Sequence, residues 1–182
     1  GALPGQDPDC VKVIERSLKK SKIKLLTETF AKGYERDGDV LKVSIERKGA
    51  LEVVECDQII STVGRRPHTE GLNLEAIGLA TDERGFLTVD ARMQTRVPHV
   101  YAIGDVAGQP MLAHKGSKEG LVAAGVIAGQ AEEYDAKCVP AVIFTSPEMA
   151  SVGLSEAAAK EQGLAVKSGS FPFAASDRKS TR

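Results

Sequence analysis

Hydrophobic and polar residues alternate with two different periods in the first third of the chain. Apolar residues recur at three- and four-residue spacing over 11–18, directly after Asp7-Pro8, and this pattern predicts a short amphipathic helix. From 23 to 64 the period is two, with turn signals at Asp37-Gly38 and Lys48-Gly49. This second pattern predicts a β-meander that covers one face of a larger sheet.

Apolar runs and capping signals predict the elements of the rest of the chain. The runs over 58–64 and 100–103 are continuous, which is typical of strands buried on both faces. Shorter strands are predicted over 86–89, 139–144 and 165–170, helices over 72–77, 113–128 and 155–162, and a polar tail over 176–182. Glycines weaken helix 113–128 by about 1 kcal/mol each relative to alanine, so we expect this helix to be packed closely against another segment.

Composition excludes several classes of protein. The 182 residues are 42% hydrophobic and 27% charged, with a formal net charge of -1, which indicates a soluble globular protein that binds neither nucleic acid nor a membrane. Three widely spaced cysteines provide no disulfide framework and no metal-type pair, as is usual inside cells. No two of the 18 glycines are separated by one residue, so the dinucleotide fingerprint G-x-G-x-x-G is absent.

The strongest candidate for chemistry is Gly104-Asp105, which ends the apolar run 100–103. In an open parallel sheet, ligands bind beyond the carboxyl ends of strands. A carboxylate there can accept hydrogen bonds from sugar-like hydroxyls, and neighbouring glycines let a ligand approach the backbone. Taken alone, the same two residues fit a turn or a helix N-cap equally well.

Several segments in a fixed order extend this signal. They are Pro98-His99-Val100-Tyr101-Ala102-Ile103-Gly104-Asp105, Met111-Leu112-Ala113-His114-Lys115-Gly116, Ser61-Thr62-Val63-Gly64-Arg65-Arg66-Pro67, Phe144-Thr145-Ser146-Pro147-Glu148 and Ser151-Val152-Gly153-Leu154-Ser155-Glu156. Together they resemble the dihydrolipoamide dehydrogenase branch of the flavin-dependent pyridine nucleotide–disulfide oxidoreductase family, and the resemblance covers essentially the whole chain. The Met-Leu-Ala-His-Lys-Gly segment favours this branch over glutathione or mercuric reductases.

The resemblance implies an α/β fold made of parts of two Rossmann-like domains, with a β-meander and the start of an α+β interface domain. The implied domains are the C-terminal part of an NAD-binding domain at 1–66, the C-terminal part of an FAD-binding domain at 67–137, and the start of a dimerisation domain at 138–182. The chain is therefore expected to be an internal fragment of such an enzyme.

The resemblance also implies binding residues for two cofactors and no catalytic or metal-binding residue in this segment. For FAD they are Gly104, Asp105, Met111, Leu112, Ala113 and His114, with Asp105 on the ribityl hydroxyls and the backbone at 113–114 facing the isoalloxazine. For NAD they are Gly64, Arg65 and Phe30. Pro67-His68 departs from the usual Pro-Asn of the family.

The implied activity is the oxidation of dihydrolipoamide through a redox disulfide and FAD, with NAD as acceptor. The parent enzyme would be a homodimer that serves the lipoyl-bearing acyltransferase of a 2-oxoacid dehydrogenase complex, in the cytoplasm or the mitochondrial matrix. Because the family's redox Cys-x4-Cys is missing from this chain, we expect little turnover from the chain alone. The alternative is a non-catalytic remnant that acts as an interaction module.

His114 and Glu119 have the five-residue spacing of the family's catalytic base pair. They lie, however, in the segment that resembles the flavin-side helix, whereas the base pair of the family lies near the C-terminus. We interpret the spacing as a coincidence and assign neither residue a role as a base.

Overall fold

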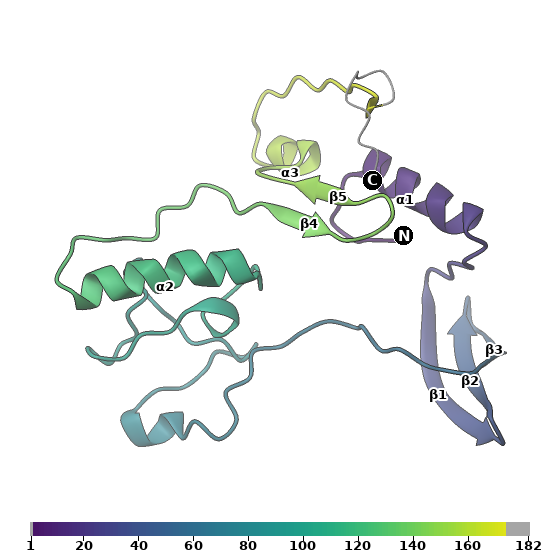
Figure 1. The fold of residues 1–182 in the computed structure, drawn as a ribbon, viewed down its shortest axis with the longest axis horizontal. Helices are drawn as coiled ribbons and strands as arrows, with labels where there is room; N and C mark the ends of the chain where they lie inside the picture. Colours follow the sequence, from purple (N-terminus) through teal and green to yellow (C-terminus); the bar gives the residue numbers. More distant parts are fainter. Residues whose placement is uncertain (1, 174–182) are drawn as a thin grey trace.

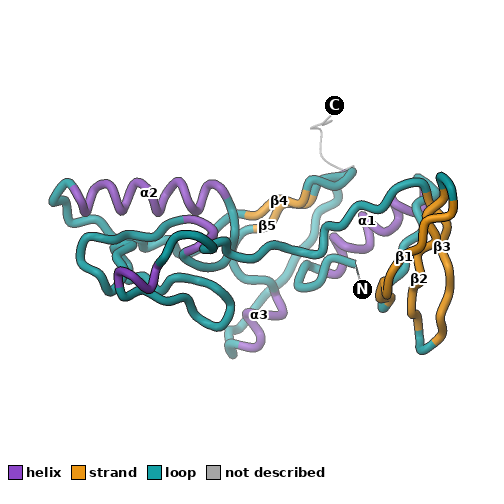
Figure 2. Tube along the Cα trace, turned by 90° about the horizontal axis from the view of Figure 1, so that it is seen from below, coloured by secondary structure: helices purple, strands orange, loops and turns teal. Residues whose placement is uncertain are grey.

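The computed structural model describes residues 2–173 of the chain, so the predicted tail over 176–182 lies outside the described residues. Three groups of elements follow one another: a helix with a three-stranded sheet, a loop-rich core with one long helix, and a small hairpin with a short helix. Figure 1 shows the three-stranded sheet standing apart from the long helix, and residues 57–70 crossing between them as extended chain. The extended arrangement is also seen from below in Figure 2.

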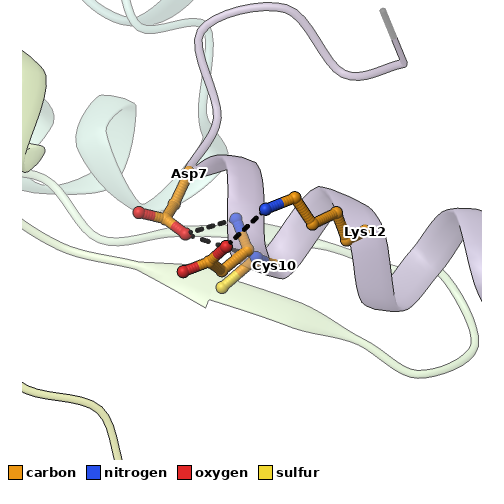
Figure 3. A network of polar contacts seen from close by, with 4 residues as sticks. Asp7, Cys10 and Lys12 are labelled. Atoms are coloured by element: carbon orange, nitrogen blue, oxygen red, sulfur yellow. Dashed lines mark hydrogen bonds and ion pairs between the residues drawn. The ribbon is translucent and has the colours of Figure 1, made fainter.

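The first helix, α1 (Pro8–Lys20), begins where the sequence predicts it to begin. The carboxylate of Asp7 accepts hydrogen bonds from the amides of Asp9 and Cys10 at 2.9 and 3.3 Å, which satisfies two amides of the first turn (Figure 3). Lys12 adds an exposed ion pair to Asp9. The N-cap prediction is therefore confirmed.

The predicted meander is an antiparallel sheet of three strands in the order β1 (Thr29–Asp37), β2 (Val40–Arg47) and β3 (Ala50–Cys56). The turns at Asp37-Gly38 and Lys48-Gly49 join the strands, with both glycines at positive φ. Only the central strand buries large side chains, those of Leu41 and Ile45. The sheet thus has one small apolar face and keeps most of its side chains in solvent.

The core of the molecule lies between residues 79 and 134. Two buried clusters form it: Met93, Val122, Ala123 and Val126 in the first, and Leu79, Leu87 and Ala102 in the second. Helix α2 (Ala113–Ile127) supplies three residues of the first cluster. A short 3₁₀ helix, η1 (Leu74–Ile77), closes at Gly78, as its sequence predicts.

The last described part holds a two-stranded antiparallel sheet, β4 (Ala141–Ile143) and β5 (Met149–Ser151), and the short helix α3 (Glu156–Glu161). Ser155 caps α3 by accepting a hydrogen bond from the amide of Ala158, so this predicted cap is confirmed. No helix in the described range 2–173 is long and apolar enough to cross a membrane.

The strand predicted over 58–64 is wrong for this structure. These residues form no strand, and the side chains of Ile60 and Val63 are 82% and 97% exposed. A central strand of a buried sheet pairs with a neighbouring strand along each edge, and no strand of the described residues pairs with this segment. The apolar composition is that of a core strand, but its partners are not among these residues.

The other predicted core strands are also shorter than expected or missing. The run 100–103 forms a single bridge, between Tyr101 and Gln94, although Ala102 is buried. Residues 86–89 contribute buried side chains without strand pairing, and 165–170 form no strand. Burial thus follows the apolar pattern here, while strand pairing depends on neighbours that the pattern does not describe.

Substitution of the central core residue should destabilise the fold. Val122 is fully buried, so we expect Val122→Ala to lower the free energy of unfolding by about 2 kcal/mol, from lost burial and the cavity left behind. The neighbouring Leu121 is 70% exposed, and Leu121→Ala should change the free energy by no more than about 0.5 kcal/mol. Urea unfolding of the chain and of both variants measures the difference; equal losses would contradict the assigned core.

Candidate functional site

The Gly104-Asp105 motif lies where the core chain turns into a 3₁₀ helix, η2 (Gly104–Val106). Gly104 has a φ of +73°, a conformation that disfavours residues with a side chain. Its backbone lies directly against helix α2, because a Cβ built on Gly116 would be 3.1 Å from the Cα of Gly104. The close packing expected from the glycines of this helix is therefore confirmed at Gly116.

Two charged side chains of α2 bind both backbone groups of Gly104. Glu119 Oε2 accepts a hydrogen bond from the Gly104 amide at 2.7 Å, and Lys115 Nζ donates to the Gly104 carbonyl at 3.2 Å. The two side chains form an ion pair at 2.8 Å, and each is only 5% exposed. Burial, together with the negative charge of Glu119, raises the pKa of Tyr134.

The beginning of α2 is left without a side-chain cap. Leu112 occupies the N-cap position and provides no side-chain acceptor, and the first helical hydrogen bond runs from the amide of Gly116 to the Leu112 carbonyl. Met111 and Leu112 are half-buried, while Ala113 and His114 are exposed. The first-turn amides therefore lie at the positive end of the helix dipole without a side-chain acceptor from the N-cap.

Asp105 is exposed, and no contact within residues 2–173 gives its carboxylate a hydrogen-bond partner. The expectation that this carboxylate closes a parallel sheet at a crevice is not met, because the preceding run forms only one bridge. What the structure shows instead is an unpaired carboxylate next to a positive-φ glycine and near an uncapped helix start. The assignment of Asp105 to a ribityl chain stays a prediction.

The structure separates His114 from Glu119. His114 Nε2 donates a hydrogen bond to the carbonyl of Pro140 at 2.7 Å, whereas Glu119 is buried against Lys115 and Gly104. The interpretation that their spacing is a coincidence stays a prediction.

The three residues predicted to bind NAD do not form a common site in the described chain. Gly64 has a φ of +128° and lies with Arg65 in the exposed extended segment. Phe30, on β1, is 68% exposed. Tyr34 and Arg36 of β1 line one pocket with residues 57–60, but none of the three predicted residues lines it, so their role in binding NAD stays a prediction.

Sequence reasoning missed the role of Lys115 and Glu119. The available signal was their i,i+4 spacing on a helix face that also carries Gly116 and Gly120, because a charged pair beside such glycines can reach an adjacent backbone. Within residues 2–173, no group of three histidines, cysteines or carboxylates could hold a metal ion. The three cysteines, all described, are free thiols.

Comparison with known proteins places this geometry in a family. The model of the pyridine nucleotide-disulphide oxidoreductases matches residues 2–120, and the model of their dimerisation domain matches residues 139–182. The chain belongs to the pyridine nucleotide-disulphide oxidoreductase family. The predicted α/β fold class is thereby confirmed, although the ladders formed within residues 2–173 are antiparallel.

Three relatives of this chain carry the same enzyme name. The chain is 49% identical over 178 residues to a dihydrolipoyl dehydrogenase of Thermus scotoductus, 45% identical over 177 residues to that of Bacillus subtilis, and 44% identical over 176 residues to that of Staphylococcus aureus. Each match covers 97% of this chain, and the chain spans 38% of the length of each of these relatives.

Solved structures of the family share the arrangement of elements. The flavoprotein disulfide reductase RclA of Escherichia coli, induced by HOCl, is similar with a TM-score of 0.84 and 26% identity over 97% of this chain and 40% of its own. LpdA of Mycobacterium tuberculosis is similar with a TM-score of 0.80 and 29% identity over 89% of this chain and 35% of its own.

The contact between the two glycine backbones should be intolerant of a methyl group. Alanine usually stabilises a helix by about 1 kcal/mol relative to glycine, but in Gly116→Ala the new Cβ meets backbone, and overpacking costs of about 1–3 kcal/mol should outweigh this gain. In Gly120→Ala the nearest atom is the flexible end of Ile103, so this variant should be as stable as the parent or more stable. Urea midpoints of the two variants measure the contrast, and a stabilised Gly116→Ala would contradict the close approach.

Proposed function

We propose that this chain is part of a dihydrolipoamide dehydrogenase, the enzyme that its curated relatives call dihydrolipoyl dehydrogenase. The carrying observation is 44–49% identity over 97% of the chain to relatives with this one name. Two family models in the expected order support the proposal. Because the chain spans 38% of these relatives, activity, substrate and partners are proposed for the enzyme to which the segment contributes.

The residues of the core site fit a flavin. The carboxylate of Asp105 is unpaired and can accept hydrogen bonds from polyol hydroxyls. Gly108, three residues further along, has a φ of +133° and nothing within 4 Å of its missing side chain, which leaves open space at that position. The uncapped amides of Ala113 and His114 supply donors and the positive end of a dipole.

Each group has a distinct task in this proposal. FAD, when bound, supplies a two-electron carrier between a dithiol and a nicotinamide. Asp105 would bind and orient the sugar-alcohol chain, and the amides of Ala113 and His114 would favour negative charge on the flavin ring. Met111 and Leu112 provide half-buried apolar surface for the flat ring.

The proposal includes the domain assignment 1–66, 67–137 and 138–182 and a homodimer formed through the last of these. The match of the dimerisation-domain model to residues 139–182 supports the homodimer. NAD is the proposed electron acceptor, but the described positions of Gly64, Arg65 and Phe30 do not converge, so we derive no step from them. The proposed partner is a lipoyl-bearing acyltransferase of a 2-oxoacid dehydrogenase complex, and the proposed location is the cytoplasm or the mitochondrial matrix.

Loss of the Asp105 carboxylate should weaken flavin binding. A charge-assisted hydrogen bond contributes about 1.5–3 kcal/mol, so we expect Asp105→Ala to raise the Kd for FAD roughly 10- to 150-fold in the flavoenzyme that carries this segment. Asp135 is also exposed, and Asp135→Ala is the matched control that should leave the Kd unchanged. Flavin fluorescence titration of the apo-protein measures both. Equal Kd values for the parent and Asp105→Ala would overturn the assignment of Asp105 to FAD. A parent enzyme that does not oxidise dihydrolipoamide would overturn the proposed activity.

The 182-residue chain by itself should not retain FAD. It lacks a G-x-G-x-x-G turn, which supplies the backbone donors and helix end for the pyrophosphate, and Asp105 alone contributes too little affinity. We therefore expect the purified chain to be colourless after incubation with FAD and desalting, as judged from its visible absorbance. A stoichiometric yellow preparation would contradict this prediction.

A further inference from the structure

The best-defined polar arrangement in the described molecule is the ion pair of Lys115 and Glu119 on the backbone of Gly104. Each side chain is 5% exposed, and each also bonds one of the two backbone groups of the same glycine. An ordinary ion pair on a helix face is solvated and contributes little. This pair is buried, and both side chains bind the backbone of Gly104. Stabilisation of the helix alone does not explain that arrangement.

Three contacts restrict the backbone of Gly104. Its amide is bound by Glu119 at 2.7 Å, its carbonyl by Lys115 at 3.2 Å, and its Cα lies against Gly116. A glycine at a φ of +73° would otherwise have access to a wide range of backbone angles. Asp105 is the next residue, so these contacts also hold the peptide from which its side chain projects.

We propose that Lys115 and Glu119 form a clamp on Gly104 that orients Asp105 for the flavin, and that both are positioning residues of the cofactor site. The inference rests on the proposed function, because Asp105 is the residue assigned to FAD. It adds that flavin affinity depends on two buried charges whose side chains point at a backbone rather than at the ligand. Fixing the carboxylate before binding lowers the entropy cost of binding.

Two substitutions of Glu119 separate the clamp from simple stability. Glu119→Gln and Glu119→Met both remove the charge opposite Lys115, but only glutamine keeps an oxygen that can accept the Gly104 amide. The difference between the two variants therefore isolates the hydrogen bond to Gly104. Lys118 is exposed on the same helix, and Lys118→Met is the control for a change of charge and surface.

Hydrogen exchange in the flavin-free enzyme that carries this segment reports on the clamp without any ligand. The measured quantity is the exchange rate of the Gly104 amide divided by that of the Val122 amide, resolved to single residues by mass spectrometry. Global unfolding raises both rates together, whereas release of the clamp raises the first alone. We expect this ratio to rise about tenfold or more in Glu119→Met, since a net hydrogen bond of this kind is lost, and less than about threefold in Glu119→Gln.

The Kd for FAD is measured on the same proteins. We expect it to rise about tenfold in Glu119→Met and to be largely restored in Glu119→Gln, with Lys118→Met equal to the parent. Equal exchange ratios in the two Glu119 variants would overturn the clamp. A selectively released Gly104 with an unchanged Kd would overturn its role in positioning. A parent protein that never binds FAD would instead contradict the proposed function, and the exchange ratio would still decide whether the clamp exists.

Discussion

The contact of two backbones, at Gly104 and Gly116, is the constraint on which the centre of this structure depends. It leaves no room for a side chain at Gly116, where a Cβ would lie 3.1 Å from backbone, and Gly104 contributes the positive φ that glycine adopts readily. The contact brings the start of η2 against the first turns of α2. Lys115 and Glu119 then complete the contact from the helix side. Removing one member of a buried ion pair typically costs about 3–5 kcal/mol, because the other charge is left unpaired. The pair is tolerable here because its remaining hydrogen-bonding groups are directed at Gly104.

Around this centre the molecule is unevenly packed. The two buried clusters lie between residues 79 and 126, whereas the sheet β1–β3 keeps Phe30, Tyr34 and Leu51 more than half exposed. The extended segment that leads from this sheet to the core is largely exposed, including its apolar residues Ile60 and Val63. The site proposed for the flavin therefore lies on the well-packed part, and the residues proposed for NAD lie on the poorly covered part. This difference explains why the first set shows a coherent geometry and the second does not.

What could be predicted from the sequence depended on how far apart the partners are in the chain. Asp7 and Ser155 cap helices through amides two or three residues away, and the Asp37-Gly38 turn closes a hairpin between adjacent strands, so local patterns sufficed. The run 58–64 has the composition of a buried strand, yet its pairing depends on other strands, which a local pattern does not specify. The clamp on Gly104 was missed for a related reason: Glu119 is 15 residues away, and its target is a backbone group with no signature of its own.

The pairing of Gly104 with Gly116 has a consequence for sequence variation. Where two side chains are in contact, a larger residue at one position can be compensated by a smaller residue at the other, so both positions can vary. Here each partner already has the smallest side group available, and a Cβ at Gly116 would come within 3.1 Å of backbone. No second-site change of residue type can restore that room. The two positions are thus restricted for different reasons. Gly116 is restricted by the approach of the Gly104 backbone, which only a shift of the helix could relieve. Gly104 is restricted by its positive φ, since a Cβ there would meet the Cα of Gly116 at an ordinary 3.9 Å.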